Sequence, residues 1–348
     1  MPSVTADLET LTARLKARAH AFELDGQWPR ASLDAYSEMS AWRWSVPPEY
    51  GGQGLATHER LATYLALARG DMSVALYVTQ HEGAVDLVVS CDNEALKQTW
   101  LPRFASGLAL TTIGYSQLTT SRQGGAPAMR ARAVDDGYVL DGVMPWVTGA
   151  PYVDNVACGA VLEDGRQILV LLDMATPGVR VVPAEPLAAL NSTHTCEVFC
   201  EEVAVANTLL IAGPEQNVLS HRSALRLLLV SATGAGLALA IMDELYAMGG
   251  HDYDEVRKSM DDAMRMTRAE LELLAERGEV NQEPIDALRI EVNCILLRLA
   301  GILMVVAKGS GYRRRAIAQR LAAEANFFAV WSASGRVRAA TAKRLAVA

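Results

Sequence analysis

The chain has 348 residues, and at about 150 residues per domain this length suggests two or three structural units. Apolar residues make up 51% of the chain and charged residues 21%, so a substantial core can form and general disorder is excluded. The formal net charge is −8, from 32 Lys and Arg against 40 Asp and Glu. Sequence-independent nucleic-acid binding depends on an excess of cations, so we expect no nucleic-acid partner.

Five scattered cysteines show no CxxC spacing. We therefore expect reduced thiols in a cytoplasmic protein, with no disulfide framework and no metal site. The N-terminal residues lack the basic and apolar regions of a secretion signal. The apolar run 227–242 is 16 residues long, which is short for a membrane span, so we expect a buried core helix and no membrane partner.

The first part of the chain, to about residue 105, is predicted to be helical. Leucines recur at helical spacing near the N-terminus, and a glycine follows the second periodic stretch. The predicted helices cover residues 8–20, 57–69 and 72–89. A loop rich in Pro and Gly, 46–54, separates the first two.

The pattern changes between about residues 110 and 212, where short alternating stretches are separated by turn signals. Asp-Asp-Gly follows the alternating stretch 129–134, and Glu-Asp-Gly-Arg joins 156–162 to 167–172. The β-branched stretch 179–182 continues the pattern. These short strands predict a compact β-barrel or sandwich.

From about residue 215 the chain is again predicted to be helical. An apolar stripe over 260–274 ends at Gly278, a candidate C-cap, and Pro284 suits the first turn of the next helix. The fold class is therefore α+β, mainly α. The predicted domains are an N-terminal helical domain (1–109), a middle β domain (110–213) and a C-terminal four-helix bundle (214–348).

Four motifs carry a resemblance to a known family. In chain order they are Val-Pro-Pro-Glu-Tyr-Gly-Gly-Gln-Gly (46–54), Ala-Arg-Gly-Asp-Met-Ser-Val-Ala (68–75), Leu-Pro-Arg-Phe-Ala-Ser-Gly (101–107) and Leu-Asp-Gly-Val-Met-Pro-Trp-Val-Thr-Gly (140–149). Together they resemble the acyl-CoA dehydrogenase superfamily of flavoproteins, over almost the whole chain. The resemblance implies FAD as cofactor, an acyl-CoA or acyl-carrier thioester as substrate, and a role in fatty acid metabolism.

Trp146 and Thr148 are the first candidate cofactor residues. Residues two apart in a strand share a face, so both can address one ligand. An indole offers a stacking wall for an isoalloxazine ring, and a hydroxyl can hydrogen-bond the N5 edge of a flavin. The alternative is a buried tryptophan beside an ordinary strand threonine; the family context favours flavin contact.

Two further segments resemble cofactor loops of the family. In Ile-Gly-Tyr-Ser-Gln-Leu-Thr-Thr-Ser-Arg (113–122), Ser116, preceded by Tyr115, stands for a threonine that contacts flavin, and Ser121 (or Thr120) stands for a hydroxyl near the pyrophosphate. The usual Glu-Pro pair is replaced by Gln-Leu and one residue is missing, so a simple polar loop is the alternative.

The second of these segments is Lys-Gly-Ser-Gly-Tyr-Arg, where Gly309 and Gly311 resemble a Gly-Gly-x-Gly-Tyr loop. In the family this loop approaches the ADP portion of the flavin on a neighbouring subunit, and glycines permit that approach. The alternative is a common helix stop. The following Arg313–Arg315 could meet a phosphate, although a solvated helix face is the simpler interpretation.

The catalytic base of the family has no counterpart at either of its usual positions. Ser332 stands where the glutamate of a Tyr-Glu-Gly-Thr-like segment is expected, and a neutral hydroxyl is no base near pH 7 without an activating partner. Arg226 occupies the alternative position on the long core helix, and arginine is permanently protonated. The catalytic residue is therefore unassigned, and the substitutes considered are His221, His194, His81 and Glu324.

The family's Arg-x-x-Phe-Gly-x-Pro-like clamp is also absent after residue 246, so FAD is expected to be weakly held or supplied in reduced form. The first hypothesis is an acyl-CoA dehydrogenase-like oxidoreductase catalysing α,β-dehydrogenation, as a homodimer or homotetramer. The alternatives are a catalytically silent subunit in a hetero-oligomer with a homologous chain, and a flavin-dependent monooxygenase that takes reduced flavin from a partner reductase.

Overall fold

The computed structural model describes residues 4–119, 125–220, 225–277 and 281–347. The helices of the N-terminal part are α1 (Val4–Asp25), α2 (Arg30–Glu38), α3 (Thr57–Gly70), α4 (Met72–Ser90) and α5 (Glu94–Ala105). The three helices predicted from periodicity correspond to α1, α3 and α4, so this part of the prediction is confirmed.

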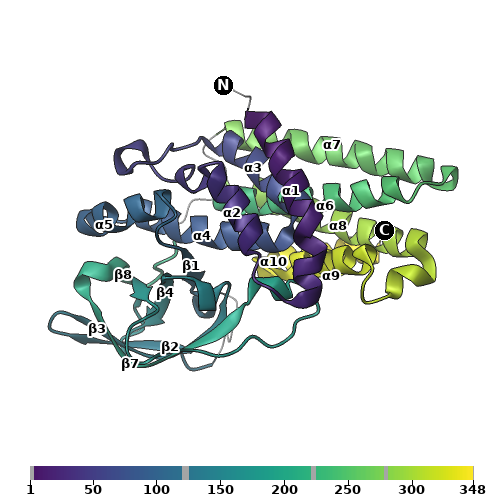
Figure 1. The fold of residues 1–348 in the computed structure, drawn as a ribbon. Helices are drawn as coiled ribbons and strands as arrows, with labels where there is room; N and C mark the ends of the chain where they lie inside the picture. Colours follow the sequence, from purple (N-terminus) through teal and green to yellow (C-terminus); the bar gives the residue numbers. More distant parts are fainter. Residues whose placement is uncertain (1–3, 120–124, 221–224, 278–280, 348) are drawn as a thin grey trace.

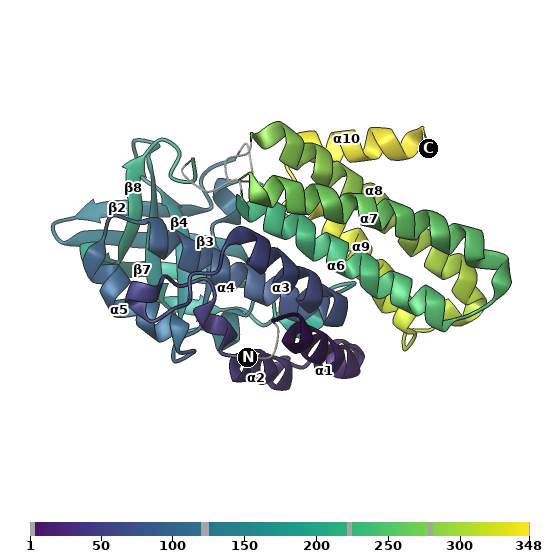
Figure 2. The same cartoon turned by 90° about the horizontal axis from the view of Figure 1, so that it is seen from above.

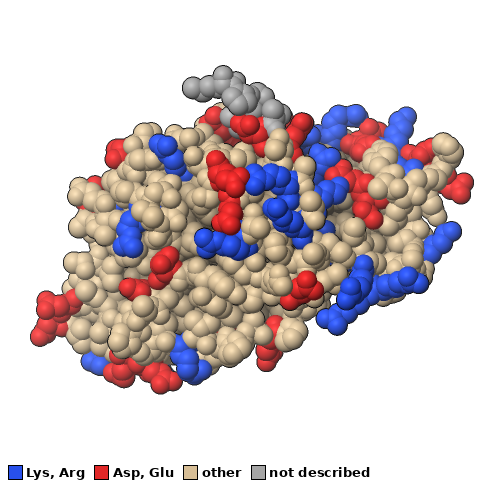
Figure 3. Space-filling view, in the orientation of Figure 1, with Lys and Arg blue, Asp and Glu red and all other residues tan. Residues whose placement is uncertain are grey.

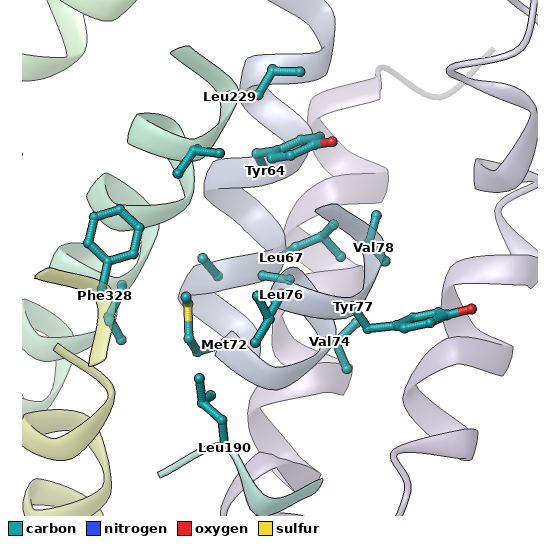
Figure 4. Close-up of a cluster of buried hydrophobic side chains, with 14 of the residues drawn as sticks. Tyr64, Leu67, Met72, Val74, Leu76, Tyr77, Val78, Leu190, Leu229 and Phe328 are labelled. Carbon is teal, nitrogen blue, oxygen red and sulfur yellow. The ribbon is translucent and has the colours of Figure 1, made fainter. Parts of the chain in front are cut away.

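Helix α4 lies at the centre of the molecule, and most of its residues are buried. Asp71 begins it, because its carboxylate accepts the backbone N–H groups of Ser73 at 2.9 Å and Val74 at 3.3 Å. Figure 4 shows side chains of α4 packed between α3, Phe328 of the C-terminal part and Leu190, which lies between residues 181 and 196 of the middle part. The core is therefore continuous across the helical and β regions.

The middle part is one mixed sheet. Its strands are β1 (Thr111–Gly114), β2 (Met129–Val134), β3 (Gly137–Val147), β4 (Asn155–Val161), β5 (Gln167–Asp173), β6 (Val179–Val181), β7 (Cys196–Ala206) and β8 (Leu210–Glu215). They are ordered β6-β7-β3-β2-β4-β5-β8, and β1 pairs with β4. The predicted hairpins are β2–β3 and β4–β5, both antiparallel.

The two halves of this sheet are joined at a single residue pair, Arg130 with Val161. Buried side chains from both halves, among them Met144, Cys158 and Val198, belong to one core cluster. The sheet thus folds over on itself, as the prediction of a compact β unit requires, and it lies beneath α4 and α5 in Figure 1.

The C-terminal part consists, within the described residues, of α6 (Leu225–Ala247), α7 (Asp254–Glu276), α8 (Gln282–Ala307), α9 (Ile317–Val330) and α10 (Gly335–Ala346). Helices α6 to α9 pack against one another and α10 packs on α8 (Figure 2). Pro284 lies in the first turn of α8, as predicted, whereas Gly278 lies outside the described residues.

Helices α6 and α8 are each long and apolar enough to cross a membrane by length and composition alone. In α6 the most apolar window is 78% buried inside the protein, which confirms the predicted core helix, and in α8 the corresponding share is 50%. Charges of both signs are interspersed over the helices on the face shown in Figure 3. Helix α8 therefore leaves more of its apolar surface uncovered than α6 does.

Candidate functional site

A cavity of about 1510 Å³ lies where the end of β3 faces α4, α6, α9 and the segment between α9 and α10. Typical small-molecule sites measure about 300–1,000 Å³, so this one has room for more than one ligand group. Residues from all three parts of the chain line it, which places it at the junction of the helical and β regions.

Trp146 and Thr148 form one wall of the cavity. Val147, between them, is fully buried in the sheet core, so its two neighbours point the other way. The side chain of Trp146 is 54% exposed. The indole therefore faces open space and is not packed shut by the protein's own side chains, and the placement of both residues on one face is confirmed.

A line of hydroxyl groups continues this wall. Thr148 Oγ1 lies 3.2 Å from Thr195 Oγ1, which lies 2.9 Å from Thr193 Oγ1. Thr193 donates in turn to the carbonyl of Leu190 at 2.7 Å. All three threonines line the cavity. The sequence analysis missed Thr193 and Thr195, for which the only signal is a short polar run between two strands.

Helix α1 fixes the turn that carries these threonines. The carboxylate of Glu23 accepts the backbone N–H of Asn191 at 2.9 Å and of Ser192 at 3.2 Å, in the short helix η5 (Asn191–Thr193). The backbone N–H of Gly149 also donates to the carbonyl of Thr193 at 2.9 Å. The end of β3 and the turn are therefore held at a fixed separation.

Tyr115 and Ser116, the other predicted cofactor residues of the middle part, also line the cavity. Ser116 Oγ is buried and has no hydrogen-bond partner among the described residues. Ser121 lies outside the described residues. Gly309 and Gly311 do not line the cavity, although Tyr312 beside them does, so their predicted role on a neighbouring subunit stays a prediction.

Ser332 lies on the opposite side, in the segment between α9 and α10, and also lines the cavity. Its backbone is left-handed, with φ of 52°. Arg289 of α8 holds this segment, because its guanidinium donates to the carbonyls of Phe328 and Trp331, each at 2.7 Å. Burial lowers the pKa of Arg289 to about 9, so it stays charged at neutral pH.

Asp286 is the one carboxylate among the described residues that line the cavity. It lies one helical turn before Arg289 on α8 and is buried. Its Oδ1 accepts from Gln282 Nε2 at 2.7 Å, and its Oδ2 pairs with Arg336 of α10. No local pattern in the sequence distinguished this residue, because its side chain reaches the cavity only through the packing of α8 against α10.

Arg226 of α6 also lines the cavity. It donates to the carbonyl of Thr79 at 2.8 Å and lies 3.9 Å from Asp86. A Cβ atom at Gly83 would come within 2.1 Å of the guanidinium, so glycine makes room for it. The alternative base position thus holds a fixed cation.

The three substitute bases among the described residues do not line the cavity. His81 accepts the backbone N–H of Thr111 at 3.2 Å, and burial lowers its pKa to about 4. Burial raises the pKa of Glu324 to about 7, against the opposing effect of its ion pair with Arg320 at 2.9 Å. His194 contacts the ring of Tyr152.

The fourth substitute, His221, lies outside the described residues. Within the described residues the substitutes therefore contact other parts of the protein and are not part of the cavity lining.

The cavity residues fit a flavin. An indole open to the space, a buried Ser116 hydroxyl without a partner and a row of threonine hydroxyls offer stacking and hydrogen bonds to a polar tricyclic ring. The volume also leaves room beside such a ring. These groups come from the β side, whereas the Ser332 segment closes the other side.

Comparisons with known proteins agree with this architecture. Residues 8–108 match the family model described as acyl-CoA dehydrogenase, N-terminal domain. The chain is 30% identical over 177 residues to a (2S)-methylsuccinyl-CoA dehydrogenase of Cereibacter sphaeroides, covering 49% of this chain and 32% of that one. It is 26% identical over 244 residues to the probable acyl-CoA dehydrogenase YngJ of Bacillus subtilis (strain 168), covering 66% and 63%.

The fold is similar to that of a solved glutaryl-CoA dehydrogenase from Mycobacterium smegmatis in complex with FADH2. The TM-score is 0.80 at 18% identity, over 99% of this chain and 94% of that one. Residues 8–108 therefore match an acyl-CoA dehydrogenase N-terminal domain, and the chain as a whole is similar to acyl-CoA dehydrogenases in sequence and in fold. These findings confirm the family resemblance that the motifs indicated, and they confirm the predicted fold class. The chain therefore spans less than two thirds of the length of either relative.

Proposed function

We propose that this protein catalyses FAD-dependent α,β-dehydrogenation of an acyl thioester. The observation that carries the proposal is the large cavity between the Trp146 and Thr148 wall and the Ser332 segment. Both groups stand at sequence positions that the resemblance singled out, although Ser332 follows Thr148 by 184 positions in the sequence. A bound flavin would supply the acceptor for a hydride from the β-carbon of the acyl group.

The β side of the cavity is proposed to hold the flavin. Trp146 would offer a stacking surface to the ring, Thr148 would address the N5 edge, and Ser116 would gain the partner that its buried hydroxyl lacks. A buried hydroxyl without a partner is costly, so a ligand that satisfies Ser116 gains affinity. FAD held in this way is expected to dissociate more readily than in relatives with the additional clamp.

The acyl chain is proposed to lie between α4 and α6. Leu76 of α4 and Leu227 and Val230 of α6 give this part of the cavity an apolar lining. Burial of methylene groups there is worth about 0.8 kcal/mol each and excludes water from the reacting carbons. The carbonyl end of the thioester is then left near the Ser332 segment, where the α-proton must be taken.

We assign to Asp286 the role of accepting the α-proton of the acyl group. A carboxylate is the ordinary proton acceptor at neutral pH, and among the described lining residues this is the one available. Gln282 and Arg336 each contact one of its oxygens, which orients the group. Arg289 holds the neighbouring segment through the carbonyls of Phe328 and Trp331, so Ser332 serves as part of the wall.

The protein is proposed to act as a homo-oligomer in the cytoplasm. Val305 at the end of α8 is 70% exposed and Tyr312 is 73% exposed, on the part of α8 and η8 (Lys308–Tyr312) that carries Gly309 and Gly311. A second copy covering this apolar surface would bring its glycine loop toward a neighbour's cofactor. All five cysteines are free and buried, as suits a reducing compartment.

The purified protein tests this function directly. We expect added FAD to bind and give a flavin absorption band that an acyl-CoA bleaches under anaerobic conditions. A colourless protein that binds FAD only with a homologous chain would instead support a silent subunit. Oxygen consumption only with supplied reduced flavin would support a monooxygenase. Either result would contradict the proposal.

A further inference from the structure

The donor and the acceptor of each hydrogen bond in the row of three threonine hydroxyls at the cavity wall can be assigned. A carbonyl oxygen only accepts, so Thr193 must donate its one hydroxyl hydrogen to Leu190, 2.7 Å away. Thr195 must then donate to Thr193 across 2.9 Å, because the hydrogen of Thr193 is already used. By the same count Thr148 donates to Thr195 across 3.2 Å.

The consequence concerns what Thr148 presents to the cavity. Its only hydrogen points along the row toward Thr195, so its remaining lone pairs face a ligand. To donate to a ligand instead, Thr148 would have to give up its bond to Thr195. Thr148 is therefore an acceptor toward the cavity.

The row is rigid enough for this direction to persist. Glu23 binds the backbone of η5, and Gly149 links the end of β3 to the carbonyl of Thr193 at 2.9 Å. Thr193 itself is buried. A rotation of one hydroxyl would leave two lone pairs facing each other at hydrogen-bond distance, which opposes the change.

The two redox states of a flavin differ at N5. The oxidised ring has a bare nitrogen there, which accepts a hydrogen bond, and the reduced ring carries N–H, which donates one. An acceptor is complementary to the reduced state, and hydrogen bonds of this kind are how a protein tunes a flavin.

We propose that the row Thr193–Thr195–Thr148 makes this site select reduced over oxidised flavin. The inference rests on the proposed function, which puts Thr148 at N5. It adds that Thr148 is a positioning residue for the redox state and that Thr195, which the family motifs do not include, sets its direction. The preference favours hydride transfer from the substrate, because it stabilises the product state of the cofactor.

The test compares dissociation constants for oxidised FAD in air and for dithionite-reduced FAD under anaerobic conditions, by fluorescence or calorimetry. Thr195→Val removes the acceptor and frees the hydrogen of Thr148. We expect oxidised FAD then to bind about tenfold more tightly, as one additional hydrogen bond implies. Thr148→Val should instead weaken reduced FAD by about tenfold and leave oxidised FAD nearly unchanged.

Thr195→Ser and Thr148→Ser keep the hydroxyls and should keep the wild-type ratio of the two constants. Circular dichroism and thermal unfolding establish that each variant folds. If FAD binds but the valine variants change both constants equally, Thr148 contacts a group common to both states, such as N3–H, and the inference is overturned. If the wild type binds neither form, the proposed function fails as well.

Discussion

The two walls of the cavity differ in how much of the expected chemistry they keep. The β wall carries Trp146, Thr148 and Ser116, all at positions that the family motifs assign to flavin contact. The opposite wall carries Ser332 where a carboxylate is expected and Arg226 at the alternative position. The proposed cofactor side of the cavity therefore keeps the residue types that the resemblance implies, whereas the proposed proton-transfer side does not, and the following experiments break or sharpen that contrast.

The largest effect is expected at Asp286. We assign to it the role of proton acceptor, for which the wall that carries Ser332 has no usual base. Asp286→Asn should lower the rate of flavin reduction by an acyl-CoA by about 10²–10⁴-fold while leaving FAD affinity unchanged. Stopped-flow absorbance measures the rate. Glu291→Gln on the same helix, whose carboxylate pairs with Arg344, is the matched control.

A glutamate at position 332, where the family has its catalytic base, should compensate for the loss of Asp286. Ser332→Glu in the Asp286→Asn background is expected to recover much of the lost rate, since the side chain at 332 lines the same cavity. If Asp286→Asn reduces the substrate as fast as the wild type, Asp286 is not the proton acceptor, and the contrast between the walls has to be explained by another group.

Arg289→Met should destabilise the second wall. Two buried carbonyls, of Phe328 and Trp331, would lose their charged donor, and each loss costs about 1–3 kcal/mol. We expect the free energy of unfolding to fall by about 3 kcal/mol in urea titrations. Arg298→Met, at an exposed position on the same helix, should change it by less than about 0.5 kcal/mol.

Two buried titratable groups outside the cavity lining, Glu324 and His81, affect stability with opposite pH dependence. The raised pKa of Glu324, about 7 in place of 4.5, gives a contribution to stability that is present below pH 4.5 and lost as pH rises through 7. The lowered pKa of His81, about 4 in place of 6.5, gives one that is present above pH 6.5 and lost as pH falls through 4.

Unfolding free energies from pH 4 to 8 test this pair. Relative to Glu324→Gln, the free energy of unfolding of the wild type should fall by up to about 3 kcal/mol as pH rises from 4.5 to 7.5. Relative to His81→Asn, whose amide oxygen can still accept from Thr111, it should lose a similar amount as pH falls from 6.5 to 4. Parallel curves for wild type and variants would show that neither group titrates as described.

The double variant Trp146→Ala, Thr148→Ala tests the first wall alone. Loss of a stacking surface and of the hydrogen bond from reduced flavin should weaken the binding of reduced FAD by about 30-fold, with the fold intact. Leu108→Ala, which removes an exposed apolar side chain outside the cavity, is the control. Unchanged FAD occupancy in the double variant would remove the β wall from the cofactor site.

Several elements were predictable because their signals are local. The leucine stripe of α1 and the turn residues of the β2–β3 and β4–β5 hairpins act over a few residues, where periodicity and turn preferences determine the backbone. The shared face of Trp146 and Thr148 follows from the two-residue repeat of a strand. The strands β7 and β8 and the helices α9 and α10 were not delimited from such signals.

The sequence by itself therefore determined the order of helical and β regions, the family and the β wall of the site. Only the tertiary structure brought Thr195 beside Thr148, 47 residues earlier, and placed Asp286 in the cavity through the packing of α8 with α10. The physical reason is that a hydrogen bond between distant residues depends on how whole elements pack, which no local pattern of side chains records.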